Sequence, residues 1–556
     1  IDVDGTTNLD VVDIDGAVNM ASTLTITGAI NGATIKADTT NFVNSYLISQ
    51  DAGTGTLNSA SNNTGFGDSV FAALTTGDNN TGIGRESMLV NTTGASNTAL
   101  GSTSLDANTT GSFNTAIGQA SLTANTTAEE NTAVGYSAAG ATTTGAVNTA
   151  VGSQALADNT TGSSNVAIGR EALHANTTAS NNTAIGKHSL RLNTTGGDNV
   201  AIGMDSMVAN TTGTANVAIG KAALDANTTA NSNVAIGKLS LTANTTGASN
   251  TGIGAESLEA NTTASNNTAV GHKALEANTT GAANVAVGTN TLKVNTTAND
   301  NVAIGHDALQ ANTTGALNTA VGVSALNANT TAASNQAFGR RALYTNTTGT
   351  ENNAFGYLAL LNNTTGSYNV GVGVNALAAN TSANNNVAVG TAALAANTTG
   401  TSNVAVGANA LDANTTATGN NAVGHNALGA NTTGASNNAM GQQALTGNTT
   451  GTNNTAIGHV ALGDNTTGAN NTAVGYLAAN TNTTGAQNVG LGAFSLNANT
   501  QSNRNTALGY NTLSSHNLTS DSNGYNTCVG FQAGSDITTG TQNTFIGGLV
   551  GDTTTT

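Results

Sequence analysis

Histidine is the residue type in this chain best able to bind a metal ion or to transfer a proton. Four of the seven histidines, His272, His306, His425 and His459, occupy the same place in a repeated unit of 17 residues. If each unit forms one coil of a stack, they lie two or more coils apart, about 10 Å at the closest. That separation is too large for one metal ion. We therefore expect solvated histidines in turns and no metal site.

The other reactive side chains are equally scattered. Glu129 and Glu130 are adjacent in a variable segment, whereas a catalytic carboxylate pair converges across a cleft. The Asp2–Gly5 segment resembles the start of a calcium loop but lacks its final glutamate. Cys528 is the single cysteine, and no histidine or acid is placed to activate its thiol. The sequence predicts no catalytic residue and no cofactor, so we do not expect an enzyme.

Composition and charge exclude further classes. The chain has 556 residues, 12 Lys and Arg against 29 Asp and Glu, and a net charge of −17. Phosphate backbones bind clustered cations, so a nucleic acid is not an expected partner. There is no apolar run of about 18 residues, which argues against membrane insertion. Because the sequence starts at Ile1 without a methionine, we interpret it as a processed chain or a fragment of a longer one.

The dominant feature is the repeat. An asparagine recurs every 17 residues from Asn63 to Asn505, through 26 steps, and again at Asn526 and Asn543. We number each unit from this asparagine, so that the unit opened by Asn216 reads NVAIGKAALDANTTANS. Position 3 is Ala or Gly, position 4 is apolar, position 5 is Gly, position 9 is usually Leu, and positions 12 to 14 usually read Asn-Thr-Thr. Such a period is typical of a solenoid.

Apolar residues at positions 2 and 4, and again at 9 and 11, have the period of two that indicates strands. Glycine at position 5 and Gly or Ala at position 15 indicate turns. We predict an all-β, parallel β-solenoid resembling a left-handed β-roll, with two strands and two turns per 17-residue coil. Asparagines at positions 1 and 12 should form stacked amide ladders. The expected structural core residues at positions 4 and 9 are Ile168, Ile219, Ile236, Leu173, Leu224 and Leu241.

The small residue at position 3 leads to a prediction about assembly. If positions 2 and 4 point into the coil, position 3 points outward. A solvent-facing residue need not be Ala or Gly in every unit, so the pattern favours close packing of copies around a shared axis. We predict a homotrimer with Ala167, Ala218 and Ala235 near that axis. The alternative is that alanine simply suits a tight strand beside the invariant glycine.

The Asn-Val-Ala-Ile-Gly core, at 165–169, 216–220 and 233–237, resembles the head repeat of trimeric autotransporter adhesins. Those heads are left-handed parallel β-rolls of three chains that bind host surfaces. Their repeat is shorter, and the enlarged Asn-Thr-Thr-Gly turn is more similar to the long repeat arrays of bacteriophage tail fibres. The resemblance covers 63–547 and implies an extracellular, trimeric fibre.

Three regions are predicted: an N-terminal β-rich stalk or connector at 1–62, the 17-residue-repeat solenoid at 63–509, and irregular C-terminal coils or a cap at 510–556. Within the first, we expect strands at 1–15 and 22–30, and a short helix or connector at 41–50. In the last, Cys528 and Phe545 replace the small residue of position 3.

The expected function is a structural and adhesive virion fibre, a tail fibre shaft that attaches to a host-surface receptor, for which a glycan is one candidate. The alternative is a trimeric adhesin of a bacterial surface. An ice-binding solenoid is a third reading, because threonines recur at positions 13 and 14, although both lie in an expected turn. A sugar-cleaving fibre would need clustered acids in a groove, which the sequence lacks. The Asn-Thr-Thr segments also match the N-glycosylation sequon, but we favour a structural ladder because neighbouring sites would be about 5 Å apart.

Overall fold

A computed structural model describes residues 29–30, 33–49, 55–551 and 553. The chain divides into two compact units, residues 1–182 and 183–556, and each is described by itself. Every regular element in the described residues is a β-strand, and the strands of the repeat pair in parallel. Both units are therefore parallel β-solenoids, as predicted. The strands expected at 1–15 and 22–28 lie outside the described residues.

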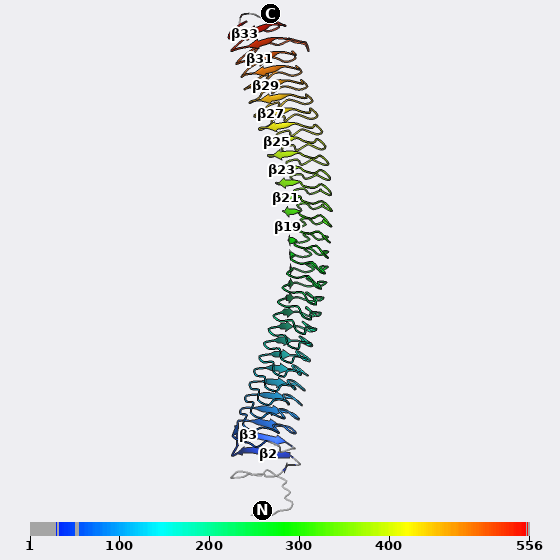
Figure 1. Cartoon of the computed structure of the whole chain (residues 1–556), viewed down its shortest axis with the longest axis vertical. Coiled ribbons are helices and arrows are strands. Elements are labelled where there is room, and N and C mark those ends of the chain that lie inside the picture. The colour runs from blue at the N-terminus through cyan, green and yellow to red at the C-terminus, as the bar shows by residue number, and fades with distance from the viewer. Residues whose placement is uncertain (1–28, 31–32, 50–54, 552, 554–556) are drawn as a thin grey trace, which may run out of the picture. The chain divides into compact units, whose positions relative to one another are not determined.

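The first unit begins with an antiparallel arrangement that covers the first coil. Strands β1 (Ala29–Ile30), β2 (Ala33–Thr39) and β3 (Phe42–Ser49) pair in that order. β3, labelled in Figure 1, then runs parallel to β4 (Ala60–Ser61) and β5 (Thr64–Phe66) of the first coil. Its side chains Phe42 and Leu47 are buried. We expected a short helix or a connector at 41–50. The helix was wrong, because Phe42–Ser49 is a strand of the sheet.

Each coil contributes one strand of three residues, at positions 2 to 4 of the unit. In the first unit these are β5, β6 (Thr81–Ile83), β7 (Thr98–Leu100), β8 (Thr115–Ile117), β9 (Thr132–Val134), β10 (Thr149–Val151) and β11 (Val166–Ile168). In the second unit they are β12 (Thr183–Ile185), β13 (Val200–Ile202), β14 (Val217–Ile219), β15 (Val234–Ile236), β16 (Thr251–Ile253), β17 (Thr268–Val270), β18 (Val285–Val287), β19 (Val302–Ile304), β20 (Thr319–Val321), β21 (Gln336–Phe338), β22 (Asn353–Phe355), β23 (Val370–Val372), β24 (Val387–Val389), β25 (Val404–Val406), β26 (Asn421–Val423), β27 (Asn438–Met440), β28 (Thr455–Ile457), β29 (Thr472–Val474), β30 (Val489–Leu491), β31 (Thr506–Leu508), β32 (Thr527–Val529) and β33 (Thr544–Ile546).

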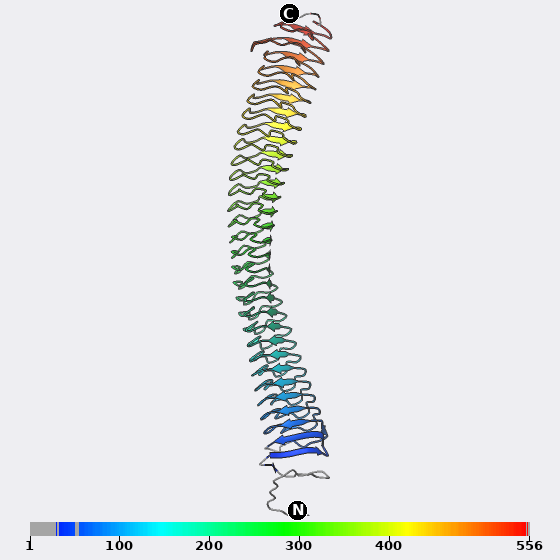
Figure 2. The ribbon, with the colours of Figure 1, turned by 180° about the vertical axis from the view of Figure 1, so that it is seen from behind.

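The register of these strands follows the repeat. Within the second unit β14 pairs in parallel with β15 so that Ala218 faces Ala235 and Ile219 faces Ile236. The strands line one side of the coils and the turns lie on the other (Figures 1 and 2). Each residue thus stacks on its equivalent in the next coil, which gives continuous columns of like side chains.

The second strand expected at positions 9 to 11 is absent from the regular coils. Leucine at position 9 has a left-handed backbone, with φ of 54° at Leu224 and 53° at Leu241, which is incompatible with an extended strand. The segment is a run of turns. It is nevertheless bonded from coil to coil, because Leu224 N–H donates to the Ser240 carbonyl oxygen over 2.9 Å. Burial of the leucine side chain offsets the cost of the left-handed conformation.

The sequence predicted that positions 4 and 9 face inward and that position 3 faces outward. The prediction was right for the leucines of position 9 and wrong for the two strand positions. Leu173, Leu224 and Leu241 are fully buried, as expected. The three position 3 alanines, however, have no exposed surface, so they belong to the core and cannot lie on a trimer axis; they are Ala167, Ala218 and Ala235. The three position 4 isoleucines predicted for the core lie on the outer face; Ile168 is 38% exposed and Ile219 and Ile236 are half-buried.

The narrow width of the coil explains this orientation. A Cβ added to Gly252 at position 3 would lie 2.6 Å from Ser240 Oγ and 3.4 Å from Leu241 Cδ1, both on the opposite side of the coil. Alanine is the largest residue at position 3 in the regular coils, and at Gly252 even one added carbon would lie too close to Ser240 Oγ, so a β-branched side chain does not fit. Val and Ile at positions 2 and 4 therefore point outward, where they are half-buried to exposed.

Two asparagine ladders run through the interior, as predicted. At position 1, the Asn216 backbone N–H donates to Asn199 Oδ1 over 3.0 Å, and Asn216 Nδ2 donates to the Ala230 carbonyl oxygen over 2.8 Å. At position 12, Asn227 Nδ2 donates to Asn210 Oδ1 over 2.9 Å. These amides are fully buried, and their hydrogen bonds remove the cost of burying polar groups.

Glycine at position 5 is required by the backbone. Gly220 has φ of 135°, a region open almost only to glycine, and an added Cβ would lie 2.6 Å from the Gly237 carbonyl oxygen. The chain turns here directly after the strand, and the next coil lies against the turn.

The C-terminal coils depart from the repeat while the strands stay in parallel register. The step from Asn505 to Asn526 is 21 residues long, yet Thr506 still faces Thr527. Cys528 is buried at position 3, whereas Phe545, at position 3 of the last coil, is half-buried. Buried His516 occupies position 12, where most coils have asparagine.

Candidate interaction surfaces

The outer side of the strands carries an apolar residue at position 4 of every regular coil and Thr, Val, Asn or Gln at position 2. We call it the strand face; it consists of the residues at positions 2 and 4. No charged residue occupies either position in the 27 units that open between Asn63 and Asn505. Position 4 side chains are half-buried to exposed, and Met440 is 55% exposed. Large uncharged patches of this kind mark interaction sites in soluble proteins.

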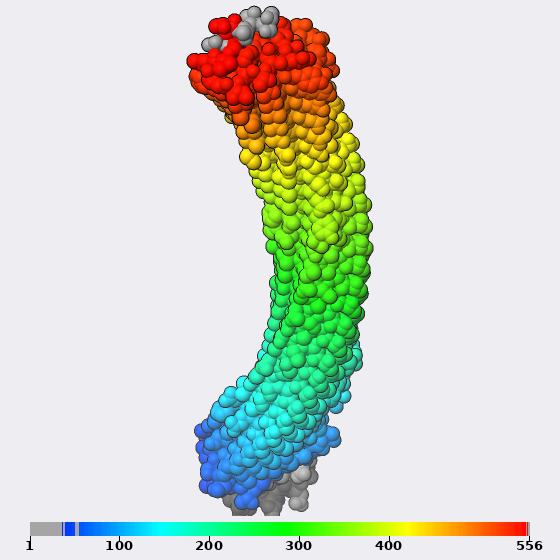
Figure 3. Space-filling view, turned by 45° about the horizontal axis from the view of Figure 1, so that its top comes forward, coloured from blue at the N-terminus to red at the C-terminus, as the bar shows by residue number. Residues whose placement is uncertain are grey.

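The strand face changes along the second unit. A shallow hollow is lined by Val423, Met440 and Ile457 beside the polar side chains of Asn421 and Asn438. Asn421 Nδ2 donates to Asn438 Oδ1 over 2.7 Å, so the two amides satisfy part of their own hydrogen bonding. Figure 3 shows side chains of successive coils of this unit in parallel rows. Because the strands pair in register, the strand face consists of columns of equivalent side chains, and the hollow is a local depression in it.

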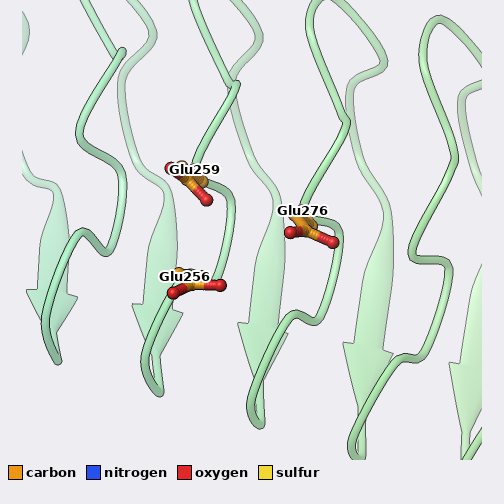
Figure 4. A group of neighbouring side chains, drawn as sticks. All are labelled: Glu256, Glu259 and Glu276. Carbon is orange, nitrogen blue, oxygen red and sulfur yellow. The ribbon is translucent and has the colours of Figure 1, made fainter.

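Three carboxylates come together on the turns of the second unit. Glu256 and Glu259 lie on one coil and Glu276 on the next (Figure 4). Lys273 Nζ lies 3.0 Å from a Glu256 carboxylate oxygen and 2.8 Å from one of Glu276. Lys293 Nζ lies 3.6 Å from the second oxygen of Glu276. The cluster is thus an ion-pair network in which a lysine already occupies the position of a counter-ion.

The pKa values of the cluster reflect this arrangement. The hydrogen bond from Lys273 lowers the pKa of Glu256, and hydrogen bonds to Glu276 and Glu256 raise the pKa of Lys273. Partial burial, followed by repulsion from the other two carboxylates, raises the pKa of Glu259. These groups are partly exposed, and exposed ion pairs stabilise a fold only weakly.

The histidines do not converge. In the part of the chain that the structure describes, only the three glutamates are close enough to share a metal ion. His306 Nδ1 lies 3.0 Å from an Asp307 carboxylate oxygen on the same turn. Buried His516 places Nε2 3.1 Å from Ser502 Oγ, and burial lowers its pKa to about 4. Burial also raises the pKa of the Cys528 thiol to about 11, which makes it a poor nucleophile at neutral pH.

Five aromatic side chains form a continuous row near the C-terminus, a feature that the sequence reasoning missed. We call it the aromatic row: His459, Tyr476, Phe494, Tyr510 and Phe531. They lie on five consecutive coils, and their ring centroids are 5.6, 5.3, 5.9 and 5.5 Å apart in that order. All stand at position 6 except Phe494 at position 7. Aligning the units by position would have revealed them.

A column of threonines follows the Asn-Thr-Thr turns. At position 13 the hydroxyl is engaged, since Thr228 Oγ1 donates to the Thr245 carbonyl oxygen over 3.2 Å. At position 14 the threonines, such as Thr229 and Thr246, are exposed. The preceding asparagine, Asn227, is fully buried, so its amide is inaccessible to glycosylation in the folded coil.

A scan against protein-family models found no match, and no curated protein matches the chain. Among the described residues there is no helix that is long and apolar enough to cross a membrane. The fold itself defines the class: a β-solenoid repeat protein with one 17-residue unit to each regular coil.

Proposed function

We propose that this chain is a structural and adhesive fibre subunit, without catalytic activity, that attaches a virion to its host. The observation that carries the proposal is the strand face, an uncovered and uncharged surface with an apolar side chain at position 4 of every regular coil. A single chain buries these side chains only in part, whereas a fibre built from several copies gains burial of the whole face. The two classes of protein that the repeat resembles are trimeric fibres of this kind.

Three copies are the proposed assembly, with the strand faces directed to the common axis. Because the copies share one repeat length, their coils can stay aligned over many units. Charged residues are confined to other positions and would remain on the outside. Attachment would then use those outer edges, with three chains adding avidity.

Light scattering coupled to size exclusion tests the assembly. The chain has a mass of 54.2 kDa, and the full-length protein should elute at three times this value. Val389→Lys combined with Val406→Lys places charges on the strand face and should give monomers. Thr391→Lys adds a charge to an exposed position 6 in the same coil as Val389 and should leave the trimer intact. A wild-type monomer would refute this part of the proposal.

Immunogold electron microscopy tests the location. Antibodies raised against the purified chain should label virion tails in cultures of the source organism, and should block adsorption. Labelling of a bacterial envelope would favour the alternative, a trimeric surface adhesin. Labelling of neither would contradict the attachment function.

Ice binding is the second candidate, and the exposed threonine column at position 14 favours it. That column supplies hydroxyls along one direction only, because the position 13 hydroxyls are bonded within the stack. A flat ice plane is matched better by two rows of free hydroxyls side by side. Thermal hysteresis of the purified protein distinguishes the two functions, and we expect none.

A further inference from the structure

We propose that the aromatic row binds a neutral polysaccharide, with sugar rings lying against the two parallel ring pairs at its ends, His459–Tyr476 and Tyr510–Phe531. The inference rests on the proposed attachment function, for which it names the chemical class of the receptor. The row is an open surface: the exposed fractions of Tyr476, Tyr510 and Phe531 are 50%, 48% and 53%. The ligand class follows from the spacing of the rings, from their exposure and from the charge around them.

The spacing fits a polymer of rings. The parallel pairs have centroids 5.6 Å and 5.5 Å apart, which is too far for full face-to-face overlap. The rings of these two pairs are therefore offset, and each leaves part of a face open, whereas Phe494 between the pairs stands edge-on, at 82° to Tyr476 and 85° to Tyr510. The interval of one coil is comparable with the length of one sugar ring in an extended polysaccharide. The C–H faces of sugars pack well on aromatic rings, which are apolar with a negative face.

The polar neighbours also suit a sugar. Phe494 at position 7 contacts the rings of Tyr476 and Tyr510 at position 6, so side chains of both positions share one edge of the coils. Asn511 and Gln532 stand at position 7 on the coils of Tyr510 and Phe531, and both are half-exposed. Their amides offer donors and acceptors to sugar hydroxyls beside the aromatic surface.

The charge of this edge distinguishes a neutral ligand from an anionic one. Lys and Arg recur at positions 6 and 7 between Arg85 and Arg341, but none follows in later units. From His459 to Phe531 these two positions contain no Asp, Glu, Lys or Arg. Single-stranded nucleic acid also stacks on aromatic rows, but it needs a cationic groove, and the chain carries −17. An uncharged polymer is the ligand that remains.

Aromatic contacts between coils also stabilise a stack, so a structural role must be separated from binding. Tyr136 provides the comparison, because it occupies position 6, is similarly exposed, and has Gln119 and Ser153 as its neighbours in the adjacent coils. A tyrosine at this position is thus compatible with the coil without aromatic partners. What is particular to the C-terminal coils is the succession of rings.

Titration calorimetry of the full-length protein with neutral hexasaccharides tests the proposal. The probes are a β-1,4-glucan, an α-1,4-glucan and a β-1,4-linked N-acetylglucosamine oligomer. At least one of these probes should bind. Tyr510→Ala should lower the affinity for that probe about tenfold or more, because it removes one stacked ring. Tyr510→Phe should retain binding, and Tyr136→Ala should not change it. Tyrosine fluorescence gives a second readout, since the chain contains no tryptophan.

Hydrogen exchange shows whether each variant keeps its fold. If Tyr510→Ala unfolds the neighbouring coils, Tyr476→Gln is used as the test variant in its place. Absence of binding by all three probes, or equal loss in Tyr136→Ala, would overturn the proposal. Loss of self-association in Tyr510→Ala without any sugar binding would identify a second copy as the occupant and would also overturn it. Sugar binding by a chain that labels neither virion nor envelope would leave this site standing and remove the attachment function.

Discussion

Thr142 occupies the place in the position 12 ladder that would give Asn125 its hydrogen-bond donor. In the preceding coils Asn125 Nδ2 donates to Asn108 Oδ1 over 2.9 Å. The buried Oδ1 of Asn125 has no partner, because the next coil presents a threonine hydroxyl instead of an amide. On the other side of the threonine, Asn159 Nδ2 donates to the Thr142 hydroxyl over 3.4 Å, which is a long hydrogen bond. The ladder is therefore interrupted once within the first unit.

Thr142→Asn should repair the interruption and stabilise the protein. The new amide would donate to Asn125 Oδ1 and accept from Asn159 Nδ2, which satisfies a buried polar atom. We expect a gain of roughly 1 kcal/mol in the free energy of unfolding. Hydrogen exchange of the coils around residue 142 measures it locally. Thr144→Asn, at the exposed position 14 of the same turn, should have no effect, and a loss of stability in Thr142→Asn would contradict the ladder account.

Gly220→Ala should destabilise the second unit. Its φ of 135° is unfavourable for any L-side chain, and the added Cβ would lie 2.6 Å from the carbonyl oxygen of Gly237. The expected loss is roughly 1–3 kcal/mol or more, seen as a lower denaturant midpoint. Gly419→Ser is the matched control, because Ser402 and Ser436 already hold the same position in the adjacent coils with φ of 59°. Equal effects of the two substitutions would refute the backbone argument.

The C-terminal coils should lose stability as the pH falls from about 6.5 to 4. Burial lowers the pKa of His516 to about 4 in the folded state, whereas an unfolded histidine titrates near 6.5. Between these values the unfolded chain binds a proton that the folded chain does not, so acid favours unfolding. Above pH 6.5 the proton linkage of His516 does not reduce the free energy of unfolding. As the pH falls to 4, this linkage lowers the free energy of unfolding by roughly 3 kcal/mol.

Hydrogen exchange around Leu513 and Ala533 measures this dependence. His516→Asn restores the ladder residue and should remove the change between pH 6.5 and 4. His425→Asn removes an exposed histidine and should leave that change as it is in the wild type. A pH dependence that persisted in His516→Asn would assign it to other groups.

The repeat predicted the solenoid, the coil length, the leucine core and the amide ladders, because strict periodicity at Asn, Gly and Leu has few other physical causes. Alternation alone did not predict which side of the strand faces inward. Period two is satisfied by either orientation, and the usual preference for burying Ile over Ala gave the wrong one. The deciding quantity was the width of the coil, seen at Gly252, which only the tertiary structure contains. The aromatic row lies at variable positions 6 and 7, so the consensus of the repeat does not contain it, and it emerges only when the residues of successive units are compared position by position.

Substitutions of neighbouring strand residues separate folding from assembly. Ala218→Glu would bury an unpaired charge against the leucine core, which costs several kcal/mol and should disrupt the coils on either side. Ile219→Glu would place the same charge on the strand face, where the position is half-exposed, so the monomer should keep its circular dichroism spectrum. The Ile219→Glu protein should instead lose the trimer mass in light scattering. If Ala218→Glu left the coils intact and only dissociated the copies, position 3 would face the axis and the inward orientation described for Ala218 would be wrong.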